Sequence, residues 1–493
     1  MKSKLTFIIA LFFVALTWAQ SGTTTDYLTN QFHKERREAL RKKMPKNSVA
    51  VFFANPIRNR ANDVDYVYHQ DPNFYYLTGY TEPNSVLLIF SDNQTNKDGK
   101  AYNELLYVQE KNPKQELWTG IRLGTEGAKN KLGFENSLNG SVFLNSGIDF
   151  YSFDNVFFTD FEEDVRNAKN EEADLYKLIA YFKSQTGYNV AVETTNVSNF
   201  QNENKLKSIT SKRANINVSV LEIYMASLRE IKSKEELVLL TKAIRISAMG
   251  QIETMKAMHS GMSEAEIQGV HEFVYKKYGS EYEGYPSIVG GGNNGCVLHY
   301  VENSKTKVDN ELVLMDLGAE YHGYTADVTR TIPANGTFSV EQKLIYDLVY
   351  EAQEAGIAEV KIGNSFTAPD QVARRIISNG LVKLGIINKL EDARTYFPHG
   401  TSHHIGLDVH DPGAYNTFEE NMVLTVEPGI YIPIGSNCDK KWWGIAVRIE
   451  DDILVTTTGP VNLSVEAPRK SNEIEALMKQ KSVLDAFSLP NLD

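Results

Sequence analysis

Short apolar runs alternate with polar or helix-like segments over residues 24–225. The runs are VAVFFAN, SVLLIFSD, ELLYVQE, NVFFTD and YNVAVE, and the segments between them include TDYLTNQFHKERREALRKKM. Apolar runs of about four to eight residues bounded by turn residues are typical of strands. Because strands and helices alternate here, this part of the chain is predicted to form an α/β domain with its own sheet.

A second domain is predicted to begin near residues 226–234, where charged residues gather. Ser233 with Glu236, and later Ser339 with Gln342, have the spacing of a capping box and mark helix starts. The helix pair from Ser233 is followed by the strand-like runs YPSIVGGG, LVLMDLG and YTADVTRTI, and the pair from Ser339 by VLTVEPGIYI and GIAVRIEDDILVT. Two helices followed by antiparallel strands, twice over, predict a pseudo-twofold domain with a cleft where the two sets of strands meet.

The first residues have the layout of a secretory signal. Lys2 and Lys4 precede an apolar run from Leu5 to about Leu16, and a cleavage site is expected near Ala19. The run is short for a membrane span, although an uncleaved N-terminal anchor is the alternative. No other run reaches about 18 apolar residues. We therefore expect an exported protein, periplasmic or secreted, with no membrane span in its mature form.

Composition narrows the class of partner. The chain has 493 residues, with 51 basic and 63 acidic side chains and a net charge of −12. No basic run is long enough to follow a nucleic-acid backbone, which argues against nucleic acid as a partner.

The only cysteines, Cys296 and Cys438, are too few for a disulfide framework. The sequence leaves open whether they form a single bridge or remain two free thiols.

Acidic residues interrupt strands that should be apolar. In VLMDLGAEYHGYTADVTRT, Asp316 lies in an apolar strand and Asp327 follows the turn predicted at EYHG. In a tight hairpin the two residues would face each other with Cβ atoms about 4.5–5.5 Å apart. Because buried like charges are costly, this arrangement predicts a cation between them.

Further acids and a histidine-rich segment complete the candidate site. Glu427 ends the apolar run VLTV, and Glu450 shares one strand face with Arg448. The segment PHGTSHHIGLDVHDPG brings in His399, His403, His404 and His410. Carboxylates with few nitrogens and no thiolate favour Mn²⁺ or Co²⁺ over Zn²⁺. A pair of ions about 3.5–4 Å apart would activate a hydroxide nucleophile.

The other hydrolase motifs fail or are absent. The HExxH motif of zinc proteases begins at His271 but has Tyr275 in place of its second histidine. The sequence contains neither a GxSxG nucleophile elbow nor a P-loop.

Six segments, in order, resemble one known family: NDVDYVYHQDPNFYYLTGYTEP, GCVLHY, MDLGAEYHGYTADVTRT, HGTSHHIGLDVHD, LTVEPGIY and VRIEDD. The chain is similar to the pita-bread metallopeptidases of family M24, which include aminopeptidase P, prolidase and methionine aminopeptidase, and most of all to the Xaa-Pro aminopeptidases. The resemblance implies an α+β fold with a pita-bread catalytic domain that has an internal pseudo-twofold duplication, preceded by a smaller α/β domain. The expected limits are 1–19 for the signal, 24–225 for the aminopeptidase P-type N-terminal domain, 230–460 for the catalytic domain and 461–493 for a C-terminal tail or helix.

The resemblance also implies roles for single residues. Five metal ligands are expected: Asp316, Asp327, His403, Glu427 and Glu450. Of these, Asp327 and Glu450 would bridge two ions, and Glu427 would also transfer the proton. His299 and His410 would lie beside the scissile bond. The pocket for proline would be lined by His399, Tyr431 and Arg448.

Several of these residues have plainer alternatives. Tyr431 would otherwise be a core residue, and Arg448 would otherwise support Glu450 through a salt bridge. His404 is interpreted as variation and not as a ligand. Trp118 is expected to pack in the core; the alternative that the resemblance implies is that it reaches a neighbouring subunit's active site, as an aromatic residue of the N-terminal domain does in some relatives.

The expected function is metal-dependent hydrolysis of the bond between an N-terminal residue and a following proline, by a hydroxide bridging two divalent ions. The ions are expected to be Mn²⁺, with Co²⁺ or Zn²⁺ as alternatives, and the chain is expected to form a homo-oligomer, a dimer or a tetramer. The first alternative is an Xaa-Pro dipeptidase (prolidase), and the second is a non-catalytic peptide-binding protein on the same fold.

Overall fold

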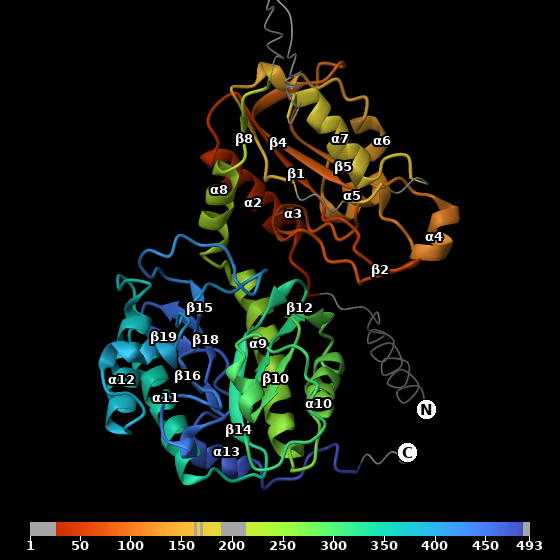
Figure 1. The fold of residues 1–493 in the computed structure, drawn as a ribbon. Helices are drawn as coiled ribbons and strands as arrows, with labels where there is room; N and C mark the ends of the chain where they lie inside the picture. The colour runs from red at the N-terminus through yellow and green to blue at the C-terminus, as the bar shows by residue number, and fades with distance from the viewer. Residues whose placement is uncertain (1–25, 162–164, 168–170, 189–212, 487–493) are drawn as a thin grey trace, which may run out of the picture.

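The computed structural model describes residues 26–161, 165–167, 171–188 and 213–486, so the predicted signal segment lies outside the described residues. Figure 1 shows an N-terminal domain, red to yellow, above a C-terminal domain, green to blue. They are joined where α8 (Val220–Arg229) leads into α9 (Lys234–Ala257). Across the described ranges, no helix combines the length and the hydropathy needed to span a bilayer.

The N-terminal domain is built on a six-stranded mixed sheet with the order β6-β5-β4-β1-β7-β8. Strand β1 pairs antiparallel with β4 and parallel with β7. Four of the five apolar runs expected to form strands do so, as β1, β4, β5 and β7, and the fifth, YNVAVE, lies outside the described residues from its second residue on. The strands are β1 (Ser48–Phe53), β4 (Val86–Thr95), β5 (Ala101–Val108), β6 (Ser137–Asn139), β7 (Asn155–Phe157) and β8 (Ile216–Asn217), with a separate hairpin of β2 (Asn59–Ala61) and β3 (Val64–Asp65). The helices are α2 (Asn30–Lys43), α3 (Pro72–Thr78), α4 (Pro113–Thr119), α5 (Gly124–Leu132), α6 (Gly140–Phe143) and α7 (Leu175–Thr186).

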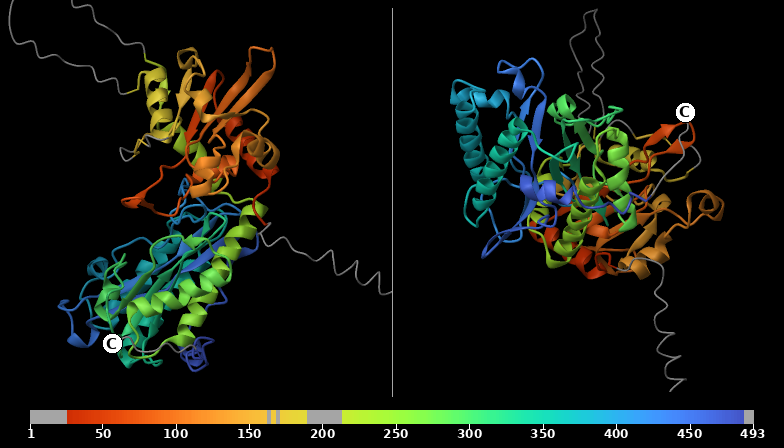
Figure 2. Two further views of the ribbon diagram at one scale, coloured as in Figure 1. Left: turned by 90° about the vertical axis from the view of Figure 1, so that its right-hand side faces the viewer. Right: turned by 90° about the horizontal axis from the view of Figure 1, so that it is seen from below.

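The C-terminal domain contains the predicted duplication. Its first half is α9, α10 (Glu264–Lys277), β9 (Tyr282–Glu283), β10 (Ile288–Gly291), β11 (Leu312–Leu317), β12 (Ala319–Tyr321), β13 (Tyr324–Thr325) and β14 (Val328–Pro333). Its second half is α11 (Val340–Ala358), α12 (Ala368–Lys383), β15 (Val423–Val426), β16 (Gly429–Ile432), β17 (Ile445–Arg448), β18 (Asp451–Thr456), β19 (Gly459–Asn462) and α13 (Ser471–Leu477). The predicted capping boxes begin α9 and α11. The two helix pairs lie on opposite sides of the strands (Figures 1 and 2).

The two halves meet along β14 and the segment that joins β17 to β18. The hydroxyl of Thr331 donates to the Arg448 carbonyl oxygen at 3.0 Å, and the Glu450 amide donates to the Thr329 carbonyl oxygen at 3.1 Å. Asp327 precedes β14 and Glu450 precedes β18. The contact between halves therefore places acids from both halves side by side.

The predicted register of the Asp316 hairpin is wrong. The turn is the two-residue loop His322–Gly323, with φ of 50° and 84°, not the EYHG segment. Two positive φ values match the twist of the flanking strands in a type I′ turn. In this register Asp316 pairs with Thr329 and not with Asp327. The two aspartates are therefore diagonal neighbours, and the reason for their convergence lies in the surrounding side chains.

Candidate metal centre

One cavity of about 410 Å³ opens between the two halves of the C-terminal domain. Four of the five predicted metal ligands stand at strand ends or within a strand: Asp316 in β11, Asp327 before β14, Glu427 after β15 and Glu450 before β18. The fifth, His403, comes from the long segment between α12 and β15. All five line this cavity, and so do His299, His399, His410 and Arg448.

The acids and His403 point toward one another. Ligand atoms of Asp327, His403 and Glu450 lie within 4.8 Å of one another. The Nε2 atom of His403 is 3.5 Å from Asp327 Oδ2 and 3.4 Å from Glu427 Oε1. The structure thus brings the five predicted ligands together, although the sequence-based register was wrong.

The backbone fixes the orientation of His403. Its Nδ1 lies 2.9 Å from the carbonyl oxygen of His404. A carbonyl only accepts, so Nδ1 carries the hydrogen and Nε2 presents a lone pair to the cavity, as metal-binding histidines commonly do. Thr425 holds the segment in place, because its amide donates to the His403 carbonyl oxygen at 2.9 Å.

Tyr285 explains how the diagonal aspartates meet. Its hydroxyl lies 2.6 Å from Asp316 Oδ1 and 2.6 Å from Asp327 Oδ1. Sequence reasoning missed this residue, because nothing in the run EGYPSIVGG distinguishes a tyrosine at the site from a core tyrosine. Its contacts depend on acids 31 and 42 residues further along the chain.

The cavity holds more negative charge than its protein partners neutralise. Arg448 Nη2 donates to Asp316 Oδ2 at 2.6 Å and is the one arginine or lysine among the residues that line the cavity. Burial acts to raise the pKa of Asp316, but Arg448 and Tyr285 outweigh it and lower that pKa. For Asp327 and Glu450, burial together with the neighbouring carboxylates raises the pKa well above its ordinary value. Without a further cation, these acids would have to hold protons.

One oxygen atom of Glu450 also indicates that a further cation belongs in the cavity. Its Oε2 accepts from the Thr329 hydroxyl at 2.6 Å, but its Oε1 has no hydrogen-bond partner among the described residues and is buried. A buried carboxylate oxygen left unpaired is costly. The residues present therefore fit divalent cations, which prefer such oxygen donors together with imidazole nitrogen.

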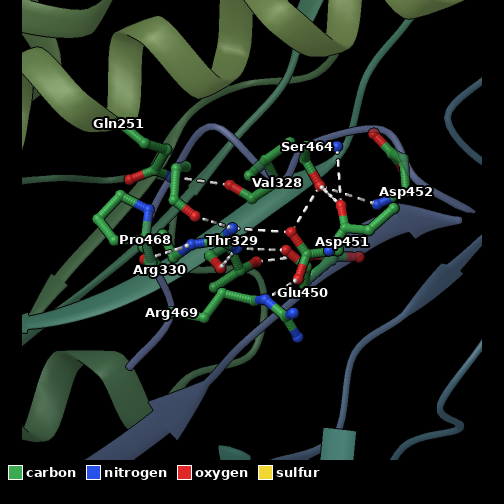
Figure 3. A network of polar contacts seen from close by, with 12 residues as sticks. Gln251, Val328, Thr329, Arg330, Glu450, Asp451, Asp452, Ser464, Pro468 and Arg469 are labelled. Atoms are coloured by element: carbon green, nitrogen blue, oxygen red, sulfur yellow. Dashed lines mark hydrogen bonds and ion pairs between the residues drawn. The ribbon is translucent and has the colours of Figure 1, made fainter. Parts of the chain in front are cut away.

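Figure 3 shows the network behind Glu450, where the neighbouring acid is fully paired. Arg330 Nη1 donates to the Glu450 carbonyl oxygen at 2.6 Å, and Nη2 donates to Asp451 Oδ1 at 2.7 Å. Asp451 also accepts hydrogen bonds from Ser464 and Gln353 and forms an ion pair with Arg469. This buried network fixes the backbone of Glu450 and leaves its side chain directed to the cavity.

The three residues predicted to line a proline pocket are in contact. His399 Nε2 lies 2.7 Å from the Tyr431 hydroxyl, and Arg448 Nη1 donates to the same hydroxyl at 2.9 Å. Burial lowers the pKa of His399 and raises that of Tyr431 to about 12. Tyr431 is buried, as expected if it were a core residue. Arg448 forms its salt bridge with Asp316 and not with Glu450, which was the partner expected in the alternative interpretation.

The other histidines take different positions. The His410 ring centroid is 4.3 Å from that of His403, and burial, followed by His403, lowers the pKa of His410. His299 lines the same cavity. His404 packs away from it, against Phe366 and Tyr415 with centroid distances of 4.7 and 4.9 Å, so it is not placed as a ligand.

Two lesser expectations are settled by the structure. The core position predicted for Trp118 is wrong, because this side chain is 84% exposed on α4. A seven-residue helix offers little surface to bury so large a ring, and α4 has no buried residue. Cys296 and Cys438 are both free thiols.

Comparison with known proteins identifies both domains. The family model of metallopeptidase family M24 matches residues 238–457, and that of the aminopeptidase P N-terminal domain matches residues 33–143. The chain is 35% identical to the Xaa-Pro aminopeptidase of Escherichia coli (strain K12), covering 92% of this chain and 98% of the relative. It is 32% identical to the Xaa-Pro aminopeptidase 3 of Homo sapiens, covering 88% and 82%.

Solved structures agree over both domains. The E. coli aminopeptidase P with the inhibitor Pro-Leu has a TM-score of 0.78 at 33% identity, covering 92% of this chain and 98% of that one. The Pseudomonas aeruginosa aminopeptidase PepP has a TM-score of 0.78 at 32% identity, covering 92% and 99%.

Proposed function

The chain belongs to metallopeptidase family M24 and carries the N-terminal domain of aminopeptidase P, and on this premise we propose that it is an Xaa-Pro aminopeptidase. It releases the first residue of peptides whose second residue is proline. The observation that carries the proposal is the cavity in which four carboxylates and the free Nε2 of His403 meet a single arginine. More metal-ligating atoms face this cavity than one arginine can neutralise, which fits a site that binds divalent cations and uses them to hydrolyse peptides.

In this proposal the five donors share a pair of ions. The ions would be held by Asp316, Asp327, His403, Glu427 and Glu450. Bound there, divalent ions supply Lewis-acid activation of water and of the scissile carbonyl. We assign Mn²⁺, because four carboxylates and one imidazole without thiolate favour a hard or borderline ion. Elemental analysis of protein purified without added metal tests that assignment.

Glu427 is the proposed proton carrier. Its Oε1 accepts from the Thr425 hydroxyl at 3.2 Å, and its Oε2 lies 3.9 Å from His399 Nδ1. Its side chain is 17% exposed, so the carboxylate reaches the cavity where substrate would lie. It takes a proton from the attacking water and returns it to the proline nitrogen as the bond breaks.

His299 and His410 would contact the reacting peptide bond. The lowered pKa of His410 keeps its ring neutral near pH 7, so that it donates a hydrogen bond to the carbonyl oxygen as negative charge develops. The proline ring would lie against His399, with Tyr431 and Arg448 fixing that histidine. A dedicated pocket is needed because the nitrogen of an Xaa-Pro bond carries no hydrogen for positioning.

The test is product analysis by mass spectrometry with Ala-Pro-Ala-Ala, Ala-Pro and Ala-Ala-Ala-Ala, each with Mn²⁺ and with chelator. Metal-dependent release of alanine from the proline tetrapeptide, with the all-alanine peptide intact, is the expected result. Cleavage of Ala-Pro alone would indicate a dipeptidase. No cleavage with metal bound would favour a peptide-binding protein.

Three further properties complete the proposal. We propose export through residues 1–19, which N-terminal sequencing of the protein made by its own host would test.

We also propose that the chain forms a homo-oligomer. The support is an exposed apolar group, Leu117, Trp118 and Ile121, whose residues are 82–85% exposed on and beside α4. Light scattering would test the oligomeric state. The limits 24–225, 230–460 and 461–493 are proposed as domain limits, and limited proteolysis would test them.

A further inference from the structure

The segment that joins the two domains is unusually rich in buried charge. Arg229, the last residue of α8, and Lys232, between α8 and α9, are each 2% exposed, and Glu230 is 9% exposed. Connecting segments normally lie on the surface, and buried charges are retained only where they are paired. The partners of these side chains therefore indicate what the segment holds.

Both cations bind the carboxylate of Asp411, which is itself 1% exposed. Lys232 Nζ donates to Oδ2 at 2.8 Å, and Arg229 Nη2 donates to Oδ1 at 2.5 Å. The Asp408 amide also donates to Oδ1, at 3.2 Å. Although burial acts to raise the pKa of Asp411, Arg229 and Lys232 outweigh it and lower that pKa. The carboxylate is thus a fixed anion bound to the linker.

The histidine-bearing loop folds around this carboxylate. The Asp411 amide donates to the His404 carbonyl oxygen at 2.9 Å, which closes residues 404–411 into a loop. A Cβ atom placed on Gly406 would lie 2.6 Å from Asp411 Oδ2, so the carboxylate fills the inside of the loop. His403 and His410 lie at the two ends of this loop. Its shape therefore determines where both rings enter the cavity.

Arg229 also contacts the N-terminal domain. Its Nη1 donates to Asn73 Oδ1 at 2.9 Å, and Asn73 lies in α3. Beside it, the Tyr76 hydroxyl donates to the Leu228 carbonyl oxygen at 2.8 Å. One guanidinium group thus connects α3, the linker and the loop.

We propose that Asp411, anchored by Arg229 and Lys232, is a positioning residue that sets the place of His410 in the cavity. The proposal rests on the proposed function, because it assigns its effect to the peptide bond that His410 would contact. Displacement of a reacting group by about 1 Å can cost about 10²-fold in rate. No helix or strand holds His410, and Asp411 is its immediate neighbour.

The test is a double-mutant cycle of Asp411→Asn with His410→Ala, measured with Ala-Pro-Ala-Ala and Mn²⁺. Asp411→Asn alone is expected to lower kcat by about 10–100-fold, with KM and bound metal near wild type. If Asp411 acts through His410, the same substitution changes kcat little when His410 is already alanine. Asp408→Asn is the matched control, because it also removes a carboxylate from Arg229 Nη2 but lies at the surface, and its kcat is expected near wild type.

The outcomes are separable. If wild type is active and the losses in kcat from Asp411→Asn and His410→Ala simply multiply in the double variant, only the positioning role is overturned. The same conclusion follows if Asp411→Asn loses bound metal and that loss accounts for its lower kcat. A wild type that binds metal and cleaves no Xaa-Pro peptide would overturn the proposed function and this inference with it. If Asp411→Asn does not fold, Arg229→Lys is put through the same cycle, because lysine keeps the charge but loses the fork that joins Asp408, Asp411 and Asn73.

Discussion

Carboxylates face in two directions where the halves of the C-terminal domain meet. Asp316, Asp327, Glu427 and Glu450 face the cavity, whereas Asp451 faces the network of Arg330 behind it (Figure 3). Glu450 and Asp451 are adjacent in the chain and equally buried. Their surroundings, not their burial, separate them.

The difference lies in the donors that the protein provides. Asp451 accepts hydrogen bonds from an arginine, a serine hydroxyl and a glutamine amide, and it forms an ion pair with a second arginine. Glu450 has one hydroxyl, and its other oxygen has no partner in the described part of the chain. A buried acid that the protein itself neutralises is structural. Where the protein does not provide enough positive charge to neutralise a group of buried acids, an external cation is expected.

The largest expected effect comes from removing one charge on the cavity side. Glu450→Gln keeps the shape of the side chain but removes a proposed metal ligand, and metal ions stabilise the transition state by several kcal/mol. We expect kcat to fall by at least about 10³-fold. Because one of several like charges is gone, the metal-free variant should unfold at the same or a higher temperature than metal-free wild type. If the variant keeps its activity, or if its metal-free form is less stable than metal-free wild type, Glu450 is not an acid that requires an external cation.

The opposite result is expected one residue further along. Asp451→Asn leaves Arg330 buried without its anion, and breaking a buried ion pair costs about 3–5 kcal/mol of unfolding free energy. The measurement is urea unfolding, together with metal content at a temperature where the variant is folded. We expect stability to fall while bound metal stays at the wild-type level, and unchanged stability would show that Asp451 is not a structural acid.

The third effect is a pH dependence that only the metal-free protein should show. In the unfolded chain the carboxyls titrate near about pH 4. In the folded metal-free protein Asp327 and Glu450 hold protons to higher pH, since burial and neighbouring carboxylates raise their pKa. The folded state then binds more protons above that pH, so stability falls as pH rises. Ions would replace these protons.

The measurement for this third effect is the difference in unfolding free energy between Mn²⁺-loaded and chelated protein from pH 5 to pH 8. Comparing the two forms cancels the titration of groups far from the cavity. The difference is expected to widen with pH in wild type and to widen less in Glu450→Gln. A difference independent of pH would contradict the assigned pKa shifts.

The smallest of these effects concerns Tyr285. Tyr285→Phe removes the hydroxyl that contacts both Asp316 and Asp327 and leaves the ring in place. Groups that orient metal ligands typically contribute 10-fold or more, so we expect a loss of about tenfold in metal affinity or kcat. Metal titration with activity as the readout tests this, and a variant equal to wild type would show that the ions alone align the aspartates.

The sequence was informative where local rules decide the structure. Capping boxes at Ser233 and Ser339 located two helix starts, and acids inside apolar strands pointed to a cation site. The fold class is confirmed, and the α/β domain and the duplication are present. The metal-ligand and proline-pocket roles stay predictions, because the structure places these side chains together without testing what they bind.

Contacts between distant segments could not be predicted. The hairpin register depended on which two residues took positive φ, and EYHG looked as suitable as His322–Gly323. The Arg229 contact with Asp411 joins residues 182 positions apart, and neither residue differs in the sequence from an ordinary surface charge. Burial decides their roles, and it is a property of the folded chain.

The most direct test of the central claim is the amount of Mn²⁺ bound per folded chain, measured by elemental analysis after gel filtration for wild type, Glu450→Gln and Asp451→Asn. About two ions per chain are expected in wild type and in Asp451→Asn, and clearly fewer in Glu450→Gln. Equal metal content in all of these proteins, or none in wild type at saturating Mn²⁺, would show that the carboxylates facing the cavity do not hold the ions.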